Sequence, residues 1–147
     1  MTSKRHATME DFTGFLIYRI GTDVARVIER TLAPTGISGR ELRVLSFLSA
    51  GELSQRELGT KAGLDRTTMV AVVDHLEELG HVDRRRSTED RRKYVIVVTS
   101  KGRTTYNDAV KRLAKAEGDY LRSLDASQRN ALHDTLRTLH AAHQIDC

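Results

Sequence analysis

The stretch SQRELGTKAGLDRTTMVAVVDHLEELGHVDRRRSTEDRRKYVIVV, residues 54–98, decides the fold. Its first part has the pattern of two helices joined by a tight turn. Ser54 begins a Ser-x-x-Glu capping box and predicts a short helix, after which Gly63 supplies the turn. Asp65 is of the residue type that caps helix N-termini, and the helix that it opens runs to Leu79. These residues predict a helix-turn-helix.

A β-hairpin with a strongly basic tip follows the two helices. The segments 81–86 and 93–98 have the pattern of strands, and the second, KYVIVV, is rich in the β-branched residues that strands favour. The predicted tip is residues 87–92. The net charge of residues 84–93 is +4, equal to that of the whole chain, and comes from Arg84, Arg85, Arg86, Arg91, Arg92 and Lys93 against Glu89 and Asp90. Such a run is often only a solvated loop, but its place between two strands favours a surface that binds a polyanion.

The helix 65–79 has an apolar face and a face of small side chains. The apolar face predicts core positions at Met69, Val72, Val73, Leu76 and Leu79. Thr67, Thr68, Val70 and Ala71 stand where a surface helix usually carries Lys and Glu. Either this helix packs against another part of the protein, or it is a recognition helix in a DNA major groove. The basic hairpin favours the second interpretation, because arginines at the tip of such a wing enter the minor groove and neutralise phosphates.

The rest of the chain is predicted to be helical, apart from a disordered start at residues 1–8. The expected helices are residues 9–32, a helix opened by Ser38 and stopped by Gly51, residues 99–124 and residues 125–143. The predicted fold is therefore mainly α with a small β-hairpin wing, in the order α-α-α-α-β-β-α-α. We expect residues 1–147 to form a single domain, with residues 38–99 as its winged helix-turn-helix lobe.

Composition excludes several classes of protein. The chain has 147 residues, 39% hydrophobic and 30% charged, and no apolar run long enough to span a bilayer or to serve as a secretory signal. We therefore expect a cytoplasmic protein. Cys147 is the only cysteine, so an internal disulfide is impossible. No catalytic motif occurs, and solvated or dimer-facing side chains explain His133, His140 and His143 better than a zinc site does. We expect no enzyme activity, no cofactor and no metal.

Residues 63–103, GLDRTTMVAVVDHLEELGHVDRRRSTEDRRKYVIVVTSKGR, resemble the winged helix-turn-helix signature of the MarR family of bacterial transcriptional regulators. The matching pieces are Leu64-Asp65-Arg66-Thr67-Thr68, Asp90-Arg91-Arg92, Thr99-x-x-Gly102-Arg103 and, upstream, Leu32-Ala33-Pro34-x-Gly36-Ile37-Ser38. The resemblance covers residues 12–143.

The resemblance implies a homodimer in which residues 9–32 and 100–143 form the helical dimerisation region. Its two lobes would reach successive major grooves of a pseudo-palindromic double-stranded DNA operator. It also implies a repressor that a small phenolic or anionic effector releases from DNA, and no membrane partner. The candidates for an effector cleft are Tyr18, Arg19, Arg43, Phe47 and Tyr106, near where the first, second and fifth helices should meet. Core packing or a surface charge is the alternative explanation for each of them.

Site residues transfer from the family only where positions match. Base contacts are expected from Thr67, Thr68, Val70 and Ala71, with Asp74 and His75 on the same helix completing the set. Arg66 and Ser54 would bind phosphates, and Arg92 or Arg91 would enter the minor groove. Further phosphate contacts are expected from Arg84, Arg85, Arg86 and Lys93, with Asp90 orienting Arg92.

Some family features are absent from this sequence. Where members often carry Thr-Arg, this chain has Val70-Ala71, which shifts the expected readout toward apolar contacts and DNA shape. The first helix has neither the cysteine of the peroxide-sensing branch nor the tryptophan of the urate-responsive branch. The alternative hypothesis is a winged-helix protein-interaction module without specific DNA binding. Loss of DNA affinity on changing Arg91 and Arg92 to alanine would distinguish the two.

Overall fold

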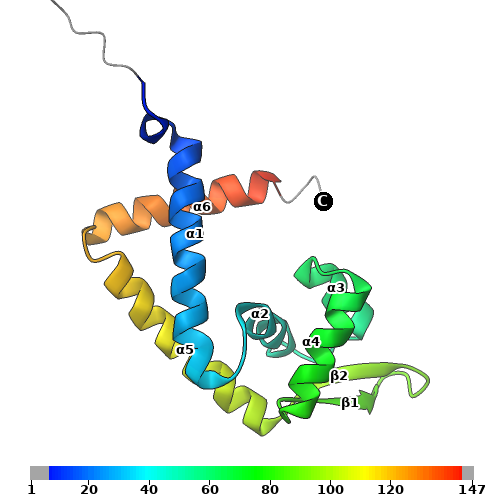
Figure 1. The fold of residues 1–147 in the computed structure, drawn as a ribbon. Helices are drawn as coiled ribbons and strands as arrows, with labels where there is room; N and C mark the ends of the chain where they lie inside the picture. The colour runs from blue at the N-terminus through cyan, green and yellow to red at the C-terminus, as the bar shows by residue number, and fades with distance from the viewer. Residues whose placement is uncertain (1–6, 144–147) are drawn as a thin grey trace, which may run out of the picture. The chain divides into compact units, whose positions relative to one another are not determined.

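The computed structural model describes residues 7–143 (Figure 1). Cys147 and His6 lie outside the described residues, as do the first six positions of the predicted disordered start. The described chain falls into two compact units that divide after Leu113. Across residues 7–143, no helix combines the length and the apolar character that crossing a membrane requires.

The elements follow the predicted order, which confirms a mainly α fold with a two-stranded antiparallel hairpin. In chain order they are η1 (Met9–Asp11), α1 (Thr13–Leu32), η2 (Ala33–Thr35), α2 (Gly39–Leu48), α3 (Gln55–Ala62), α4 (Arg66–Glu78), β1 (Val82–Arg86), β2 (Tyr94–Val98), α5 (Ser100–Tyr120) and α6 (Ala126–His143). Helix α5 begins in the first unit and ends in the second.

Several boundaries differ from the sequence prediction for local reasons. The first long helix begins at Thr13 because Phe12 is extended, and η1 before it is closed by hydrogen bonds between Thr8 and the Asp11 carboxylate. His81 lies before β1 because its N–H donates to the last turn of α4. Lys93 lies before β2 because its N–H closes the hairpin tip. Helix α5 ends at Tyr120, four residues before the predicted end.

The predicted capping boxes all form. At Ser38 and Ser54 the backbone N–H donates to the glutamate three residues later, at 2.6 and 2.8 Å. Asp125 and Gln128 form the equivalent pair at the start of α6. Asp65 accepts from the Thr68 N–H at 2.9 Å and caps α4. Gly80, at φ +74°, ends α4 in the left-handed conformation that glycine adopts without steric cost.

The core of the first unit lies where α2, α3 and α4 pack together and against β1 and β2. Its fully buried large side chains are Leu32, Val44, Leu45, Leu48, Leu58, Met69, Val73, Leu76 and Val82. The predicted core face of α4 is confirmed, with Leu79 half-buried at its edge. Packing of this kind fixes α4 by one face and leaves its opposite face exposed.

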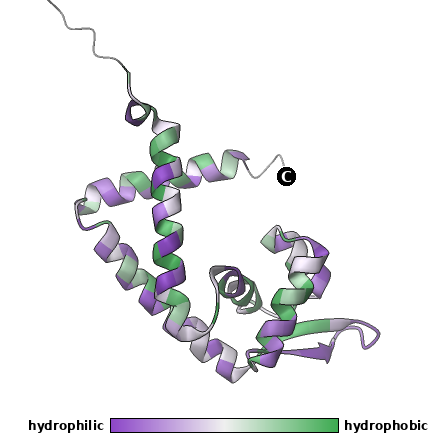
Figure 2. Ribbon diagram, viewed as in Figure 1, coloured by the Kyte–Doolittle hydropathy of each residue, from purple (hydrophilic) through white to green (hydrophobic). Residues whose placement is uncertain are grey.

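The hairpin is anchored by a third strand-like contact that the sequence analysis missed. Strand β1 pairs antiparallel with β2 from Val82–Val98 to Arg86–Tyr94. On the other edge of β2, Leu53 and Ile96 exchange both backbone hydrogen bonds, at 3.3 and 2.7 Å. Figure 2 shows the hydrophobic β2 beside the hydrophilic β1. The apolar strand is therefore the inner one, and the arginine-rich strand is the edge.

Two helices, one from each unit, expose apolar side chains. On α1 these are Leu16, Ile17 and Ile20, with Phe12 just before the helix. On α6 they are Leu132, Leu136 and Leu139, and no residue of this helix is buried. Contiguous exposed apolar residues of this kind mark an interaction surface.

Gly102, in the first turn of α5, is required by close packing. A Cβ atom at this position would lie 2.0 Å from the carbonyl oxygen of His81. We expect Gly102→Ala to lower the free energy of unfolding by about 3 kcal/mol, because backbone must move. In the same helix nothing lies within 4 Å of a Cβ added at Gly118, so Gly118→Ala is the matched control. It should stabilise by about 0.5–1 kcal/mol. Urea unfolding measures both, and equal stabilities would contradict the packing argument.

Candidate nucleic-acid interface

The outer face of α4 presents the small side chains that the sequence predicts to contact bases. Thr67, Val70 and Ala71 are exposed, as is Arg66 at the start of the helix. Thr68 is half-buried, and its hydroxyl donates to Asp65 Oδ2 at 2.7 Å. This bond lowers the pKa of Asp65, which keeps the cap charged. Thr68 therefore serves the helix cap in the free protein.

Ser54 is also engaged within its capping box. Its hydroxyl donates to Glu57 Oε2 at 2.7 Å and accepts from the Glu57 N–H at 3.2 Å. The hydrogen bonds from Ser54 lower the pKa of Glu57. Phosphate binding by this hydroxyl would require its donor bond to be exchanged.

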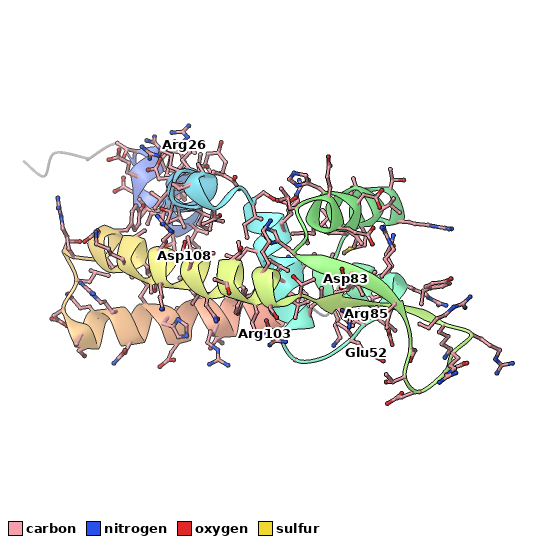
Figure 3. The ribbon with its side chains drawn as sticks, turned by 90° about the horizontal axis from the view of Figure 1, so that it is seen from below. Arg26, Glu52, Asp83, Arg85, Arg103 and Asp108 are labelled. Carbon is pink, nitrogen blue, oxygen red and sulfur yellow. The ribbon has the colours of Figure 1, made fainter. Side chains whose placement is uncertain are left out.

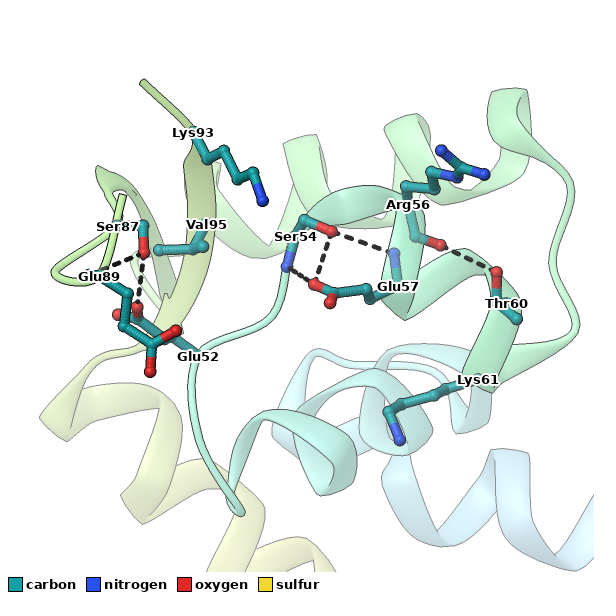
Figure 4. Close-up of a pocket in the computed structure, with 10 residues that line it drawn as sticks. All are labelled: Glu52, Ser54, Arg56, Glu57, Thr60, Lys61, Ser87, Glu89, Lys93 and Val95. Carbon is teal, nitrogen blue, oxygen red and sulfur yellow. Dashed lines mark hydrogen bonds between the residues drawn. The ribbon is translucent and has the colours of Figure 1, made fainter. Parts of the chain in front are cut away.

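A cleft of about 760 Å³ lies between the start of α3 and the hairpin (Figure 4). Its charged lining residues are Arg56, Lys61 and Lys93 against Glu52, Glu57 and Glu89. Three cations and three carboxylates balance, so the cleft has no net charge to attract an anion. Neither Arg56 nor Lys61 belongs to a charge run, so no pattern in the sequence points to them.

Arg84 joins the wing to the recognition helix. Its guanidinium forms ion pairs with Asp74 and Glu77 of α4, and its backbone N–H donates to Glu77 Oε1 at 3.3 Å. The hydrogen bond with Asp74 raises the pKa of Arg84. Two carboxylates thus neutralise a side chain that the sequence predicts to bind phosphate.

Arg85 and Arg86 also have partners inside the protein. Arg85 pairs with Asp83 of its own strand at 2.7 Å (Figure 3). The Arg86 guanidinium lies over the Tyr94 ring, 4.1 Å from its centre, and donates to the carbonyl oxygens of Arg91 and Arg92 at 3.2 and 3.5 Å. Arg86 therefore crosses the hairpin and holds its tip.

The tip is ordered by short-range hydrogen bonds around Ser87. The buried Ser87 hydroxyl accepts from the N–H groups of Glu89 and Asp90 and donates to Glu52 at 3.2 Å. One oxygen of Asp90 accepts from both the N–H and Nε of Arg92, at 3.0 and 3.4 Å. The Arg92 side chain remains 92% exposed. Arg91 and Lys93 are exposed too, and no carboxylate pairs with either of them within residues 7–143.

The five predicted effector residues lie on α1, α2 and the part of α5 that belongs to the first unit. Arg19 lies 6.0 Å from the Phe15 ring, and Arg43 lies 5.9 Å from the Phe47 ring. Phe47 and Tyr106 pack against the core, whereas Tyr18 is exposed. None of the five lines the cleft between α3 and the hairpin, or a second cleft on α1 that is lined by Ala25, Arg26, Glu29 and Arg30. The effector site stays a prediction.

Metal ligands do not cluster in the described part of the chain. No group of three or more His, Cys, Asp or Glu side chains among residues 7–143 is placed to hold an ion. His75 of α4 contacts Glu41 of α2 instead.

Comparison with known proteins decides the family. The MarR family model matches residues 35–93. The structure of CouR from Rhodococcus jostii RHA1 bound to p-coumaroyl-CoA is 34% identical, with a TM-score of 0.77 over 90% of this chain and 94% of that one. A MarR-family transcriptional regulator from Rhodococcus sp. RHA1 is 33% identical, with a TM-score of 0.78 over 92% and 96%. The chain belongs to the MarR family.

Further relatives agree with this assignment. The repressor CouR bound to a 23-mer DNA duplex is 29% identical, with a TM-score of 0.82 over 95% of this chain and 99% of that chain. An uncharacterised helix-turn-helix regulator of Bacillus subtilis, YdgJ, is 33% identical over 71% of this chain, and the match spans 64% of its own length. This MarR-family chain is a DNA-binding transcriptional regulator of the winged helix-turn-helix type, a class that is not enzymatic.

The divided roles of the wing arginines can be measured by salt dependence. Arg84→Ala and Arg91→Ala each remove one positive charge. The slope of log affinity against log salt reports the number of phosphates neutralised. We expect Arg91→Ala to reduce this slope by about 1 for each subunit. Arg84→Ala should weaken binding without changing the slope, because Arg84 is already paired. Fluorescence anisotropy over a salt series checks this, and equal slope losses would make Arg84 a phosphate contact.

Proposed function

We propose that the protein is a homodimeric repressor that binds a pseudo-palindromic operator, with α4 in the major groove and the wing tip in the minor groove. One observation carries the proposal. The exposed face of small side chains on α4 lies next to a wing whose cations are held by a hydrogen-bonded frame. Preordered donors lose less entropy when they bind. The similar structure of the repressor CouR bound to a 23-mer DNA duplex supports DNA binding by this fold.

Within this proposal the residues divide into three tasks. Thr67, Val70 and Ala71 contact base edges, and Thr68 joins them by exchanging its bond with Asp65. Arg91, Arg92 and Lys93 supply the contacts to phosphates and to the minor groove. Arg66, Arg85 and Ser54 are phosphate contacts at the margins, whereas Arg84, Arg86 and Asp90 orient the wing.

We propose a homodimer because α1 and α6 expose apolar side chains that a second copy of the chain could bury. The leucines of α6 and the residues Leu16, Ile17 and Ile20 of α1 are exposed in the single chain. A second copy would bury them and would set the distance between two recognition helices. We propose residues 9–32 and 100–143 as the dimerisation region and residues 38–99 as the DNA-binding lobe. The dimer would act in the cytoplasm.

We further propose that an anionic aromatic ligand releases the protein from DNA. CouR binds p-coumaroyl-CoA, a thioester with an aromatic acyl group and several phosphates. In this chain Arg19 lies over the Phe15 ring and Arg43 over the Phe47 ring, and the first unit also carries Tyr18 on α1 and Tyr106 on α5. Such pairs suit a ligand with both a ring and a negative charge. The ligand would weaken DNA binding only by its preference for the dimer geometry that mismatches the operator.

DNA binding is tested with the duplex upstream of the protein's own gene. At about 100 mM salt we expect the wild type to shift this duplex at micromolar protein. Arg91→Ala with Arg92→Ala should reduce affinity at least about tenfold and make the salt slope shallower. Arg122→Ala with Arg137→Ala removes the same charge outside the lobe and should retain binding. Equal losses of affinity in both double variants would mean that the wing contributes only to the net positive charge of the protein. Failure of the wild type to bind would favour a protein-interaction module.

The dimer is tested by placing a charge on α6. We expect Leu136→Glu to raise the dimer dissociation constant at least about 100-fold, because each subunit would bury an unpaired carboxylate. Asn130→Glu introduces the same charge at an exposed position toward the other side of α6 and should leave the dimer intact. Sedimentation velocity over a concentration series measures both. A wild type that sediments as a monomer at every concentration would contradict the proposal.

A further inference from the structure

A buried carboxylate connects the start of α2 to the middle of the recognition helix. The Glu41 side chain is only 8% exposed. Its Oε2 accepts the Ser38 N–H at 2.6 Å, and its Oε1 contacts Nδ1 of His75. A buried carboxylate is tolerated when its oxygens are hydrogen-bonded, and here both are. Glu41 therefore caps one helix and holds a side chain of another.

This contact fixes the chemistry of the imidazole. An ionised carboxylate only accepts hydrogen bonds, so Nδ1 of His75 carries a proton and Nε2 is the nitrogen that titrates. The His75 side chain is 48% exposed, on the flank of the α4 face that presents Ala71 and Asp74. The hydrogen bond that His75 donates to Glu41, and then the charge of Glu41, raise the pKa of His75 above the ordinary value. The half-exposed ring is thus poised to become a cation at the DNA-binding face.

Of the two histidines in this region, His75 and His81, the surrounding groups favour protonation of His75 only. Glu78 of α4 adds a smaller attraction for the proton. His81, which follows α4, is buried with its Nδ1 lacking a partner, and burial lowers its pKa. Lys101 of α5 lowers the pKa of His81 further. His81 consequently stays neutral where His75 gains its proton.

We propose that Glu41 is a positioning residue that holds the His75 ring toward DNA, and that operator binding protonates this ring, with uptake of up to one proton for each α4. This inference rests on the proposed placement of α4 in the major groove. The polyanion stabilises the imidazolium, and the buried carboxylate beneath it fixes the ring and supplies the compensating charge. Helix α4 lacks the arginine that family members often carry at this place, and protonation of His75 would give the helix a positive charge there.

The sign of the pH dependence follows from linkage. DNA phosphates raise the pKa of His75 beyond the value that Glu41 already sets in the free protein. Between these two values the complex binds more protons than the free protein, so affinity rises as pH falls through that window. Because Glu41 raises the lower limit, the window lies above the ordinary histidine value. Removing the Glu41 charge moves it to lower pH.

The experiment measures DNA affinity by fluorescence anisotropy from about pH 8 to about pH 6, on the labelled duplex upstream of the protein's own gene. With two recognition helices, we expect wild-type affinity to rise about tenfold over this range. His75→Gln should show a nearly flat profile. Glu41→Gln keeps a capping-box residue and a hydrogen-bond acceptor while removing the charge, and its profile should move to lower pH. Glu78→Gln removes the same charge from a residue that acts on His75 only through its charge, with no hydrogen bond, and it should move the profile much less.

Imidazole nitrogen NMR of the free protein gives an independent measurement. We expect Nδ1 of His75 to remain protonated throughout, with titration at Nε2, and Glu41→Gln to lower the pKa of His75 more than Glu78→Gln does. A His75→Gln profile as steep as the wild-type profile, or a Glu41→Gln profile that does not move, would overturn the inference. Binding with a flat wild-type profile overturns this inference alone. Absence of binding at every pH overturns the proposed function together with it.

Discussion

The ion pairs that Arg84 makes with Asp74 and Glu77 hold the wing in register with the recognition helix. A two-stranded hairpin is marginally stable by itself, so its direction must be set by what it packs against. Leu53 pairs with one edge of β2, and the ion pairs of Arg84 connect β1 to α4. In the proposed complex the helix and the wing would therefore approach DNA together, because the fold already sets their spacing.

This arrangement separates attraction from discrimination. Several arginines of the wing bind partners within the protein, namely Asp83 and the carbonyl oxygens of the tip. In the proposed complex the cations left at the tip would contact phosphates, which carry no base identity. Discrimination between bases would then depend on α4, whose small side chains would let the backbone come close to the base edges. An apolar pair such as Val70 and Ala71 favours thymine methyl groups and local DNA shape over bidentate hydrogen bonding.

Features that depend on residues close together in the sequence could be predicted, whereas contacts between residues far apart in the sequence could not. Caps, turn glycines and the core face of α4 depend on residues a few positions apart, and these predictions were confirmed. The contact of Glu41 with His75 joins residues 34 positions apart, and no local pattern announces it. The same holds for the pairing of Leu53 with Ile96. The arginine run was recognisable as charge, but its division between internal partners and exposed groups depends on which carboxylates the fold brings near. Individual DNA contacts and the effector site remain predictions.

The position of β1 at the outer edge of the sheet has a consequence for solubility. An unpaired strand edge is a template on which a strand of another molecule can assemble. Here that edge carries the sequence Asp83-Arg84-Arg85-Arg86, and strands that meet it would bring like charges together. We therefore expect the basic residues that suit the wing to nucleic acid also to oppose pairing of two copies of the protein through the β1 edge. Selection for one property would maintain the other.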